Sequence, residues 1–189
     1  MQEFISYLLQ FGSLNQQEIG LINKKADLLM LAKGDYFWEA GKMVRQIGFL
    51  TEGVIRICYY NNKAEEITRY FVDEDHLILA GNEIDENYIP SVYLQAVTDC
   101  KLIVFYKKDW KEIHDTIINW ENIIQKITAK THREKIERRS ELISQDATTR
   151  YLDFIGKFPT LLNRVPLAYI ASYLGITQSS LSRIRKSIR

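Results

Sequence analysis

The chain has 189 residues and a mass of 22.2 kDa, and its composition, 46% hydrophobic and 26% charged, is typical of a globular protein rather than a disordered one. No apolar stretch approaches the roughly 18 to 20 residues of a membrane-spanning helix, and the N-terminus lacks a basic start followed by a cleavable apolar segment, so we expect a cytoplasmic protein without a membrane partner. The net charge of +1 conceals an asymmetry, because residues 1–125 hold 12 basic and 19 acidic side chains whereas residues 126–189 hold 13 basic and 5 acidic ones.

The segment from Leu28 to about Lys107 consists of short runs rich in β-branched and aromatic residues, separated by turn residues about every ten positions. The turn signals fall at Gly34-Asp35, Gly41, Gly53, Asn61-Asn62, 73–75 and Asp99. This spacing predicts an antiparallel β-roll of the jelly-roll type. The stretch YYNNKAEE is its clearest hairpin, because Asn tolerates the positive φ of a tight turn. A short helix around 16–25 is expected to precede the roll.

The pattern becomes helical after Lys108, and one long helix is predicted from about Asn119 to about Ser144. An apolar stripe occupies its first half, at Trp120, Ile123, Ile124 and Ile127. Two uses of this helix are open: dimerisation along it, which we favour, and packing against the roll within one chain. A further helix is predicted over DATTRYLDFIGKF with Asp146 as its N-cap, and the following TLLNRV is compatible with a minimal strand or hairpin.

Residues 165–189, VPLAYIASYLGITQSSLSRIRKSIR, have the apolar spacing of a helix-turn-helix. Gly175 permits a left-handed turn between the two helices, and Ala171 is the small residue at their contact. The anchoring apolar positions are Ile170, Leu174, Ile176, Leu181 and Ile184. The alternative is a helical hairpin that only packs and whose basic residues are solvated. Because no acidic residue follows Pro159, we favour a nucleic-acid-binding helix.

Thr177 is expected to cap the second helix, whose outward residues carry groups that hydrogen-bond to bases or phosphates. The candidate DNA-binding residues are Thr177, Gln178, Ser179, Ser180, Ser182, Arg183, Arg185, Lys186 and Arg189. Gln178 can pair with adenine and Arg183 with guanine, whereas Lys186 and Arg189 lie late enough in the helix to contact phosphates.

Three features follow one another along the chain: the glycine-punctuated KGDYFWEAGK and FLTEGVIRICYYNNKAEEITRYF, the long helix, and LAYIASYLGITQSSLSRIRKSI. Together they resemble the Crp/Fnr family of transcriptional regulators over nearly the whole chain. The resemblance implies an α+β fold: a cyclic-nucleotide-binding-like β-roll over 1–108, a long dimerisation helix over 109–144 and a winged helix-turn-helix over 145–189. It also implies a homodimer that binds double-stranded DNA at an inverted repeat, with RNA polymerase as a potential further partner and no enzymatic activity.

Two features depart from the family pattern. Gln178 and Ser179 stand where many relatives carry Arg and Glu, so the preferred DNA sequence should differ from that of the best-known members, although Arg183 keeps the basic residue of the recognition helix. The sequence stops after Arg189 without the strand pair that usually follows, so we expect the wing to be reduced to the stretch before Pro166 or trimmed.

A roll that binds a cyclic nucleotide needs a cationic group for the phosphate, yet no Lys or Arg occurs between Arg69 and Lys101. The same interval carries the acidic residues Asp73, Glu74, Asp75, Glu83, Asp85, Glu86 and Asp99. We therefore expect no cyclic nucleotide, and a roll that is either unliganded or binds an uncharged molecule. If a ligand is bound, the candidate residues are Arg56, Arg69, Gly81, Asn82, Glu83, Pro90 and Ser91.

Cysteine and histidine residues indicate neither a cofactor nor a metal site. Cys58 and Cys100 have no CxxC partner and are expected to be small core residues, and His76, His114 and His132 have no ligand at metal-binding spacing. A β-roll enzyme is therefore disfavoured. The leading hypothesis is a sequence-specific DNA-binding transcriptional regulator that does not respond to cyclic nucleotides. The alternative is a ligand-sensing β-roll that acts mainly through protein partners.

Overall fold

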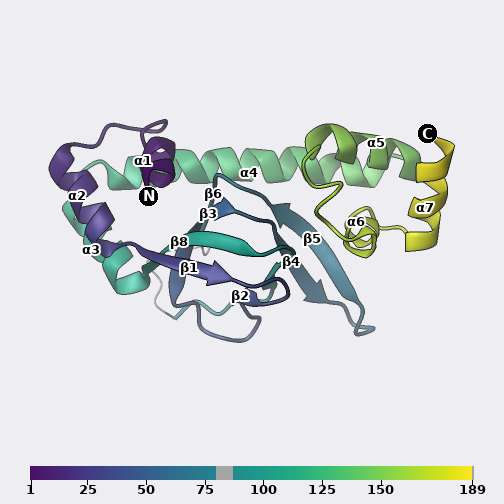
Figure 1. Cartoon of the computed structure of the whole chain (residues 1–189), viewed down its shortest axis with the longest axis horizontal. Helices are drawn as coiled ribbons and strands as arrows, with labels where there is room; N and C mark the ends of the chain where they lie inside the picture. Colours follow the sequence, from purple (N-terminus) through teal and green to yellow (C-terminus); the bar gives the residue numbers. More distant parts are fainter. Residues whose placement is uncertain (80–86, 189) are drawn as a thin grey trace.

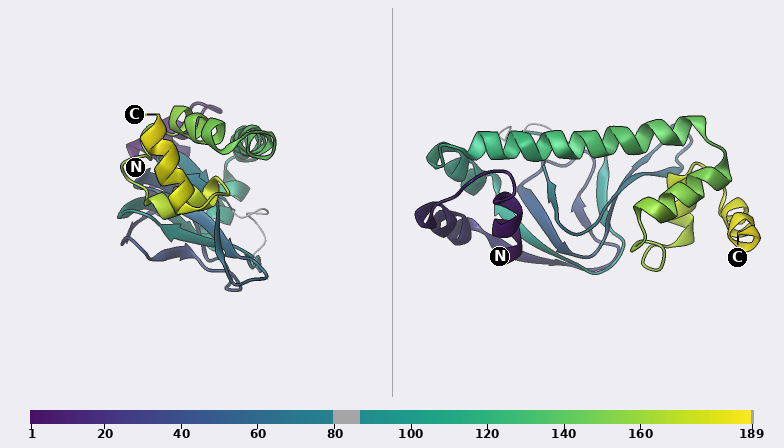
Figure 2. Two further views of the ribbon diagram at one scale, coloured as in Figure 1. Left: turned by 90° about the vertical axis from the view of Figure 1, so that its right-hand side faces the viewer. Right: turned by 90° about the horizontal axis from the view of Figure 1, so that it is seen from above.

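The computed structural model describes residues 1–79 and 87–188, with the backbone alone over 138–144. Figure 1 shows a β-roll with helices at both ends and the long helix α4 (Trp120–Ser144) running beside it. Seen from above, α4 extends from α3 (Lys107–Thr116) to α5 (Ala147–Lys157) along the whole roll (Figure 2). The predicted α+β fold, with an antiparallel roll, a long helix and a terminal helix-turn-helix, is confirmed.

The roll consists of two four-stranded antiparallel sheets. The first sheet has the order β1 (Asp27–Leu31), β8 (Cys100–Tyr106), β3 (Gln46–Glu52) and β6 (His76–Ile78). The second has the order β2 (Tyr36–Trp38), β7 (Tyr93–Ala96), β4 (Ile55–Tyr60) and β5 (Glu66–Val72). A core that includes Ile55, Leu94 and Leu102 lies between them. The sequence pattern does not predict β2 and β6, because three residues are too few to show an alternation.

The predicted hairpin joins β4 to β5, but its turn differs in detail from the prediction. The left-handed residue is Ala64, with φ 58°, rather than an asparagine. Asn61 contributes through its side chain instead, because its Oδ1 accepts the backbone N–H groups of Lys63 and Glu65 at 2.9 and 3.0 Å. The asparagine signal therefore located the turn correctly through a different mechanism, a side chain that replaces backbone hydrogen-bond partners.

Two helices precede the roll. The predicted helix is α2 (Gln16–Lys25), and it begins with a capping box in which Asn15 and Glu18 each accept the other's backbone N–H. The sequence does not predict α1 (Gln2–Leu8), because seven residues show too little periodicity. Phe4 of α1 is fully buried, with its ring centroid 5.1 Å from that of Phe49 in β3.

The apolar stripe of α4 is used within the chain. Trp120, Ile123, Ile124 and Ile127 are at most 2% exposed and share one core with α1, α3 and the first sheet. Packing against the roll, one of the two uses left open for this helix, is therefore the one that the stripe serves, while dimerisation along α4 stays a prediction. Any dimer that forms along α4 must use a different face of the helix.

The C-terminal unit contains α5, α6 (Leu167–Tyr173) and α7 (Gln178–Ser187). Asp146 caps α5 as predicted, accepting the N–H groups of Thr148 and Thr149. Residues 160–165 form turns, so the minimal strand or hairpin predicted there is wrong, and the part of this unit that the structure describes contains no strand that could serve as a wing. Over the described ranges, none of the helices is both long enough and apolar enough to cross a bilayer.

Candidate nucleic-acid interface

Helices α6 and α7 form the predicted helix-turn-helix (Figure 1). Ile170, Leu174 and Leu181 are at most 1% exposed, and Ala171 is 2% exposed at the contact between the helices. The remaining predicted anchors, Ile176 and Ile184, pack against the same core and are partly buried. The apolar spacing of the sequence therefore located this motif correctly.

The turn between the helices is a Schellman motif. Gly175 has φ +66°, its N–H donates to the carbonyl of Ser172 at 3.1 Å, and the N–H of Ile176 donates to the carbonyl of Ala171 at 3.0 Å. Arg150 of α5 adds a hydrogen bond from its guanidinium to the carbonyl of Leu174. Sequence reasoning did not identify Arg150, because its partner lies on another helix. These bonds fix the direction in which α7 leaves the turn.

The first turn of α7 is held by its own hydroxyl groups. Thr177 caps the helix as predicted, because its Oγ1 accepts the N–H of Ser180 at 3.2 Å. The same oxygen lies 2.9 Å from the hydroxyls of both Ser179 and Ser180. Ser180 is therefore engaged in the cap and partly buried, which makes it a weaker candidate for a base contact than its neighbour Gln178, which is exposed.

The outward face of α7 carries the other predicted residues. The exposed ones are Thr177, Gln178, Ser179, Arg183 and Lys186, and the partly buried ones are Ser180, Ser182 and Arg185. Arg189 lies outside the described residues. No acidic residue occurs in α7, and its basic side chains form no ion pair with any other described residue. This face therefore presents hydrogen-bonding and cationic groups to solvent, the chemistry that recognises a DNA groove and its phosphates.

Arg56, a candidate ligand residue, is 2% exposed and lies on the outer side of β4, where it faces α6. Its guanidinium donates to the carboxylate of Glu66 at 2.5 Å and to the amide oxygen of Gln95 at 2.6 Å. The ring of Tyr169 in α6 covers it, with the guanidinium carbon 3.7 Å from the ring centroid. A ligand phosphate inside the roll would therefore not meet this guanidinium.

The other ligand candidates are scattered. Arg69 is an exposed bulge residue of β5, because Ile57 pairs with Tyr70 and Cys58 with Thr68. It lies near Lys135 of α4, and burial together with the charge of Arg69 lowers the pKa of that lysine. Pro90 is buried and accepts the N–H of Gly41 at 2.9 Å, Ser91 is exposed, and Gly81, Asn82 and Glu83 lie outside the described residues.

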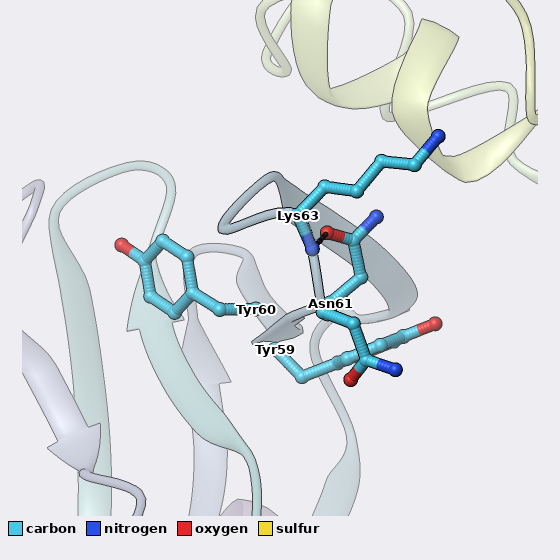
Figure 3. Close-up of a pocket in the computed structure, with 5 residues that line it drawn as sticks. Tyr59, Tyr60, Asn61 and Lys63 are labelled. Carbon is cyan, nitrogen blue, oxygen red and sulfur yellow. Dashed lines mark hydrogen bonds between the residues drawn. The ribbon is translucent and has the colours of Figure 1, made fainter.

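Cys58 and Cys100 are buried and free, as predicted for core residues. The described part of the chain contains no group of three or more His, Cys, Asp or Glu side chains arranged for a metal ion. An open depression at the tip of the β4–β5 hairpin is lined by residues 59–63 (Figure 3). Its lining comprises two tyrosines, two asparagines and Lys63, and it has no acid–base pair that would indicate catalysis.

No protein-family model matches the chain, and no curated protein sequence does. Solved structures do match it. FixK2 from Bradyrhizobium japonicum is similar with a TM-score of 0.75 at 13% identity, over 86% of this chain and 84% of that protein. The c-di-GMP-responsive global regulator CLP from Xanthomonas campestris is similar with a TM-score of 0.72 at 13% identity, over 92% and 91% of the two chains.

A third match carries the family name. A transcriptional regulator from Eubacterium rectale that is assigned to the Crp/Fnr family is similar with a TM-score of 0.73 at 16% identity, over 92% of this chain and 83% of that one. The similarity covers between 86% and 92% of this chain in the three cases. The protein therefore has the fold of the Crp/Fnr transcriptional regulators.

Proposed function

We propose that the protein is a sequence-specific DNA-binding transcriptional regulator without catalytic activity. The observation that carries this proposal is α7, a helix fixed by a Schellman turn and an N-cap whose exposed face holds Gln178, Ser179, Arg183 and Lys186 and no acidic residue. A helix of this kind at the end of a helix-turn-helix enters the major groove, where Gln and Arg hydrogen-bond to base edges. The acid-free surface supplies the attraction to phosphate.

The protein would act as a homodimer. One recognition helix from each subunit would enter successive major grooves about 34 Å apart, so the operator would be an inverted repeat. Gln125, Ala129 and Ile136 are exposed on α4, at heptad-like spacings of 4 and 7 residues, and Ile136 is 68% exposed. This face, opposite to the buried stripe, supports a dimer contact that leaves the internal packing of α4 unchanged. The chain would then divide into a roll over 1–108, a connecting helix over 109–144 and a DNA-binding unit over 145–189.

We also propose that DNA binding does not depend on a cyclic nucleotide. Arg56 is occupied by Glu66, Gln95 and Tyr169, and the interval from 70 to 100 contains no Lys or Arg that could meet a phosphate. Titration with cyclic AMP, cyclic GMP and c-di-GMP should therefore neither raise the melting temperature nor change the affinity for DNA. A rise with any of the three would contradict this part of the proposal.

The deciding experiment is selection of random duplex DNA by the purified protein at ~150 mM salt, with the solution mass measured alongside. Recovery of an inverted repeat by a dimer supports the proposal. If no sequence is enriched over random DNA, with or without added nucleotide, the protein is not a sequence-specific regulator.

One observation favours a second function, a ligand-sensing roll that acts through protein partners. Arg69 of β5 and Lys135 of α4 are exposed, and the charge of Arg69 adds to desolvation in lowering the pKa of Lys135. A small anion bound beside the two side chains would reduce their mutual repulsion, an effect that solvent screens at an exposed site. Stabilisation by a small organic anion in a thermal-shift screen, lost in Arg69→Gln, would support this function.

A further inference from the structure

The C-terminal unit does not extend freely from the roll but is attached to it by polar and cation–aromatic contacts, beside a shared apolar core. We call these contacts the docking interface; they join Arg56, Thr68 and Glu74 of the roll to Tyr169, Ser172 and Arg164 of the C-terminal unit. Each pair is more than 80 residues apart in the sequence.

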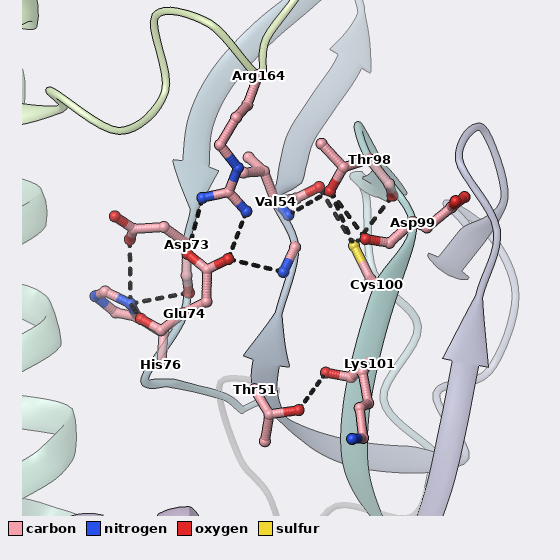
Figure 4. A network of polar contacts seen from close by, with 11 residues as sticks. Thr51, Val54, Asp73, Glu74, His76, Thr98, Asp99, Cys100, Lys101 and Arg164 are labelled. Carbon is pink, nitrogen blue, oxygen red and sulfur yellow. Dashed lines mark hydrogen bonds and ion pairs between the residues drawn. The ribbon is translucent and has the colours of Figure 1, made fainter.

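The first contact is a bidentate salt bridge between Glu74, in the turn between β5 and β6, and Arg164, in the loop before α6. Both terminal nitrogens of Arg164 donate to the carboxylate of Glu74, one of them at 3.1 Å (Figure 4). The same carboxylate accepts the N–H of Gly53 at 2.8 Å, so a backbone group of the roll also holds Glu74 in place. Gly53 cannot carry a side chain here, because its φ is +107° and a Cβ atom would lie 2.6 Å from the carbonyl oxygen of Asp99.

The second contact fixes α6 on β5. The backbone N–H of Thr68, in this edge strand, donates to Oγ of Ser172 at 2.9 Å. The ring of Tyr169, one turn earlier in α6, stacks on Arg56. An edge-strand N–H that would otherwise face solvent is therefore satisfied by the helix-turn-helix itself.

The third contact is apolar. Phe71 of β5 is fully buried, and its ring centroid lies 5.5 Å from that of Tyr173 in α6 and 6.2 Å from that of Phe154 in α5. Val54 and Val97 of the roll belong to the same core. The C-terminal unit therefore shares its hydrophobic core with the roll.

None of these roll contacts touches the outward face of α7, which remains exposed while the unit is docked. Docking fixes α6 relative to the roll, and the Schellman turn fixes α7 relative to α6. We infer that Glu74, Arg164, Ser172 and Tyr169 are positioning residues that preset the separation of the two recognition helices, so that the dimer prefers one operator spacing without an effector. This inference rests on the proposed function.

The test uses the full-length protein and Glu74→Gln, which keeps an acceptor for the N–H of Gly53 but removes the charge that binds Arg164. The matched control is Glu52→Gln, the same change at a side chain that is 71% exposed and 3.9 Å from Lys101. Two quantities are measured: hydrogen exchange of the Thr68 amide without DNA, and binding to inverted repeats whose half-sites are separated by different spacers.

In Glu74→Gln we expect the Thr68 amide to exchange faster, affinity for the preferred spacer to fall about tenfold, and affinity for a single half-site to change less than about twofold. Arg164→Met should show the same changes as Glu74→Gln. The double variant Glu74→Arg with Arg164→Glu, which exchanges the two charges, should restore part of the spacer preference. Glu52→Gln should match the wild type in each assay. A half-site readout separates positioning from loss of folding, because a misfolded helix-turn-helix would lose half-site binding as well.

An unchanged spacer preference in Glu74→Gln would overturn the inference, and so would an unchanged exchange rate at Thr68. Failure of the wild type to select any repeat would instead refute the proposed function, and the positioning role would fail with it. The exchange experiment needs no DNA, so it reports separately whether the docking interface forms.

Discussion

Tyr169 of α6 covers the guanidinium of Arg56, with the guanidinium carbon 3.7 Å from the ring centroid, and this stack connects the helix-turn-helix to a charge network on the outer face of the second sheet. Arg56 is 2% exposed, so the ring helps to shield the guanidinium from water, whereas the side chain of its partner Glu66 is 28% exposed. A cation–aromatic contact from which water is excluded contributes more to folding stability than the same contact at the surface.

Replacing Tyr169 with leucine should therefore lower the free energy of unfolding by about 1 kcal/mol, because Leu preserves apolar cover but not the interaction with the cation. Denaturant unfolding measures the change. Tyr59→Leu, at a tyrosine in the hairpin that is 36% exposed, is the control and should have little effect. Equal losses in the two variants would show that the stack adds nothing to stability.

Arg183→Ala should relax the sequence preference of the protein. Arg183 is exposed on the outward face of α7 and can donate two hydrogen bonds to guanine, which are worth about 1 to 3 kcal/mol of discrimination. Selection of random DNA by the variant should recover the repeat with one position degenerate. If the variant selects the same sequence as the wild type, Arg183 does not read a base.

Lys186→Ala should instead weaken binding to all duplexes alike. Lys186 lies in the last turn of α7, where an ammonium meets phosphate rather than base edges. Losing one phosphate contact per subunit should reduce the slope of log affinity against log salt by about 0.9 for each contact. Affinities measured at several salt concentrations test this, and a loss confined to particular sequences would assign the residue to base recognition.

The Glu74 contribution to stability should depend on pH. Burial raises the pKa of Glu74, but hydrogen bonds from Arg164 and from backbone N–H groups, including that of Gly53, outweigh it, so the pKa lies below its ordinary value of 4.5. The carboxylate therefore adds stability that is fully present above that ordinary value and is lost as pH falls through the lowered pKa. The difference in unfolding free energy between wild type and Glu74→Gln should be constant near neutral pH and shrink in acid. If this difference in unfolding free energy stayed constant down to pH values well below 4.5, the salt bridge between Glu74 and Arg164 would not contribute to stability.

Ile136→Asp should convert the proposed dimer to a monomer. Ile136 is 68% exposed and lies on the face of α4 opposite to the buried stripe, so an aspartate there leaves the subunit core intact but places two like charges together across a dimer axis. Analytical ultracentrifugation at micromolar concentration measures the mass. Met43→Asp, at a loop side chain that is 52% exposed, controls for the added charge and should leave the dimer unchanged. A dimeric Ile136→Asp would place the subunit contact elsewhere.

Much of the fold could be predicted because its signals are local. Gly175 at the turn and Thr177 and Asp146 at helix starts each form hydrogen bonds or turns with residues only a few positions away, so the neighbouring sequence is enough to predict them. Periodicity over ten or more residues identified α4 and α5 for the same reason. The elements that the pattern missed, α1, β2 and β6, are three to seven residues long.

Only the tertiary structure decided which partner each side chain meets. The apolar stripe of α4 is compatible with a second subunit or with the chain's own roll, and only the structure shows that it packs against α1, α3 and the first sheet. From the sequence, Arg56 is a candidate ligand-binding residue. Only the structure shows that its guanidinium pairs with Glu66 and is covered by the ring of Tyr169. Glu74 and Arg164 lie 90 residues apart, and only the packing of the C-terminal unit on β5 brings their charges together. Local propensities determined the secondary structure here, whereas burial and pairing of charge depend on distances that the chain acquires only when it folds.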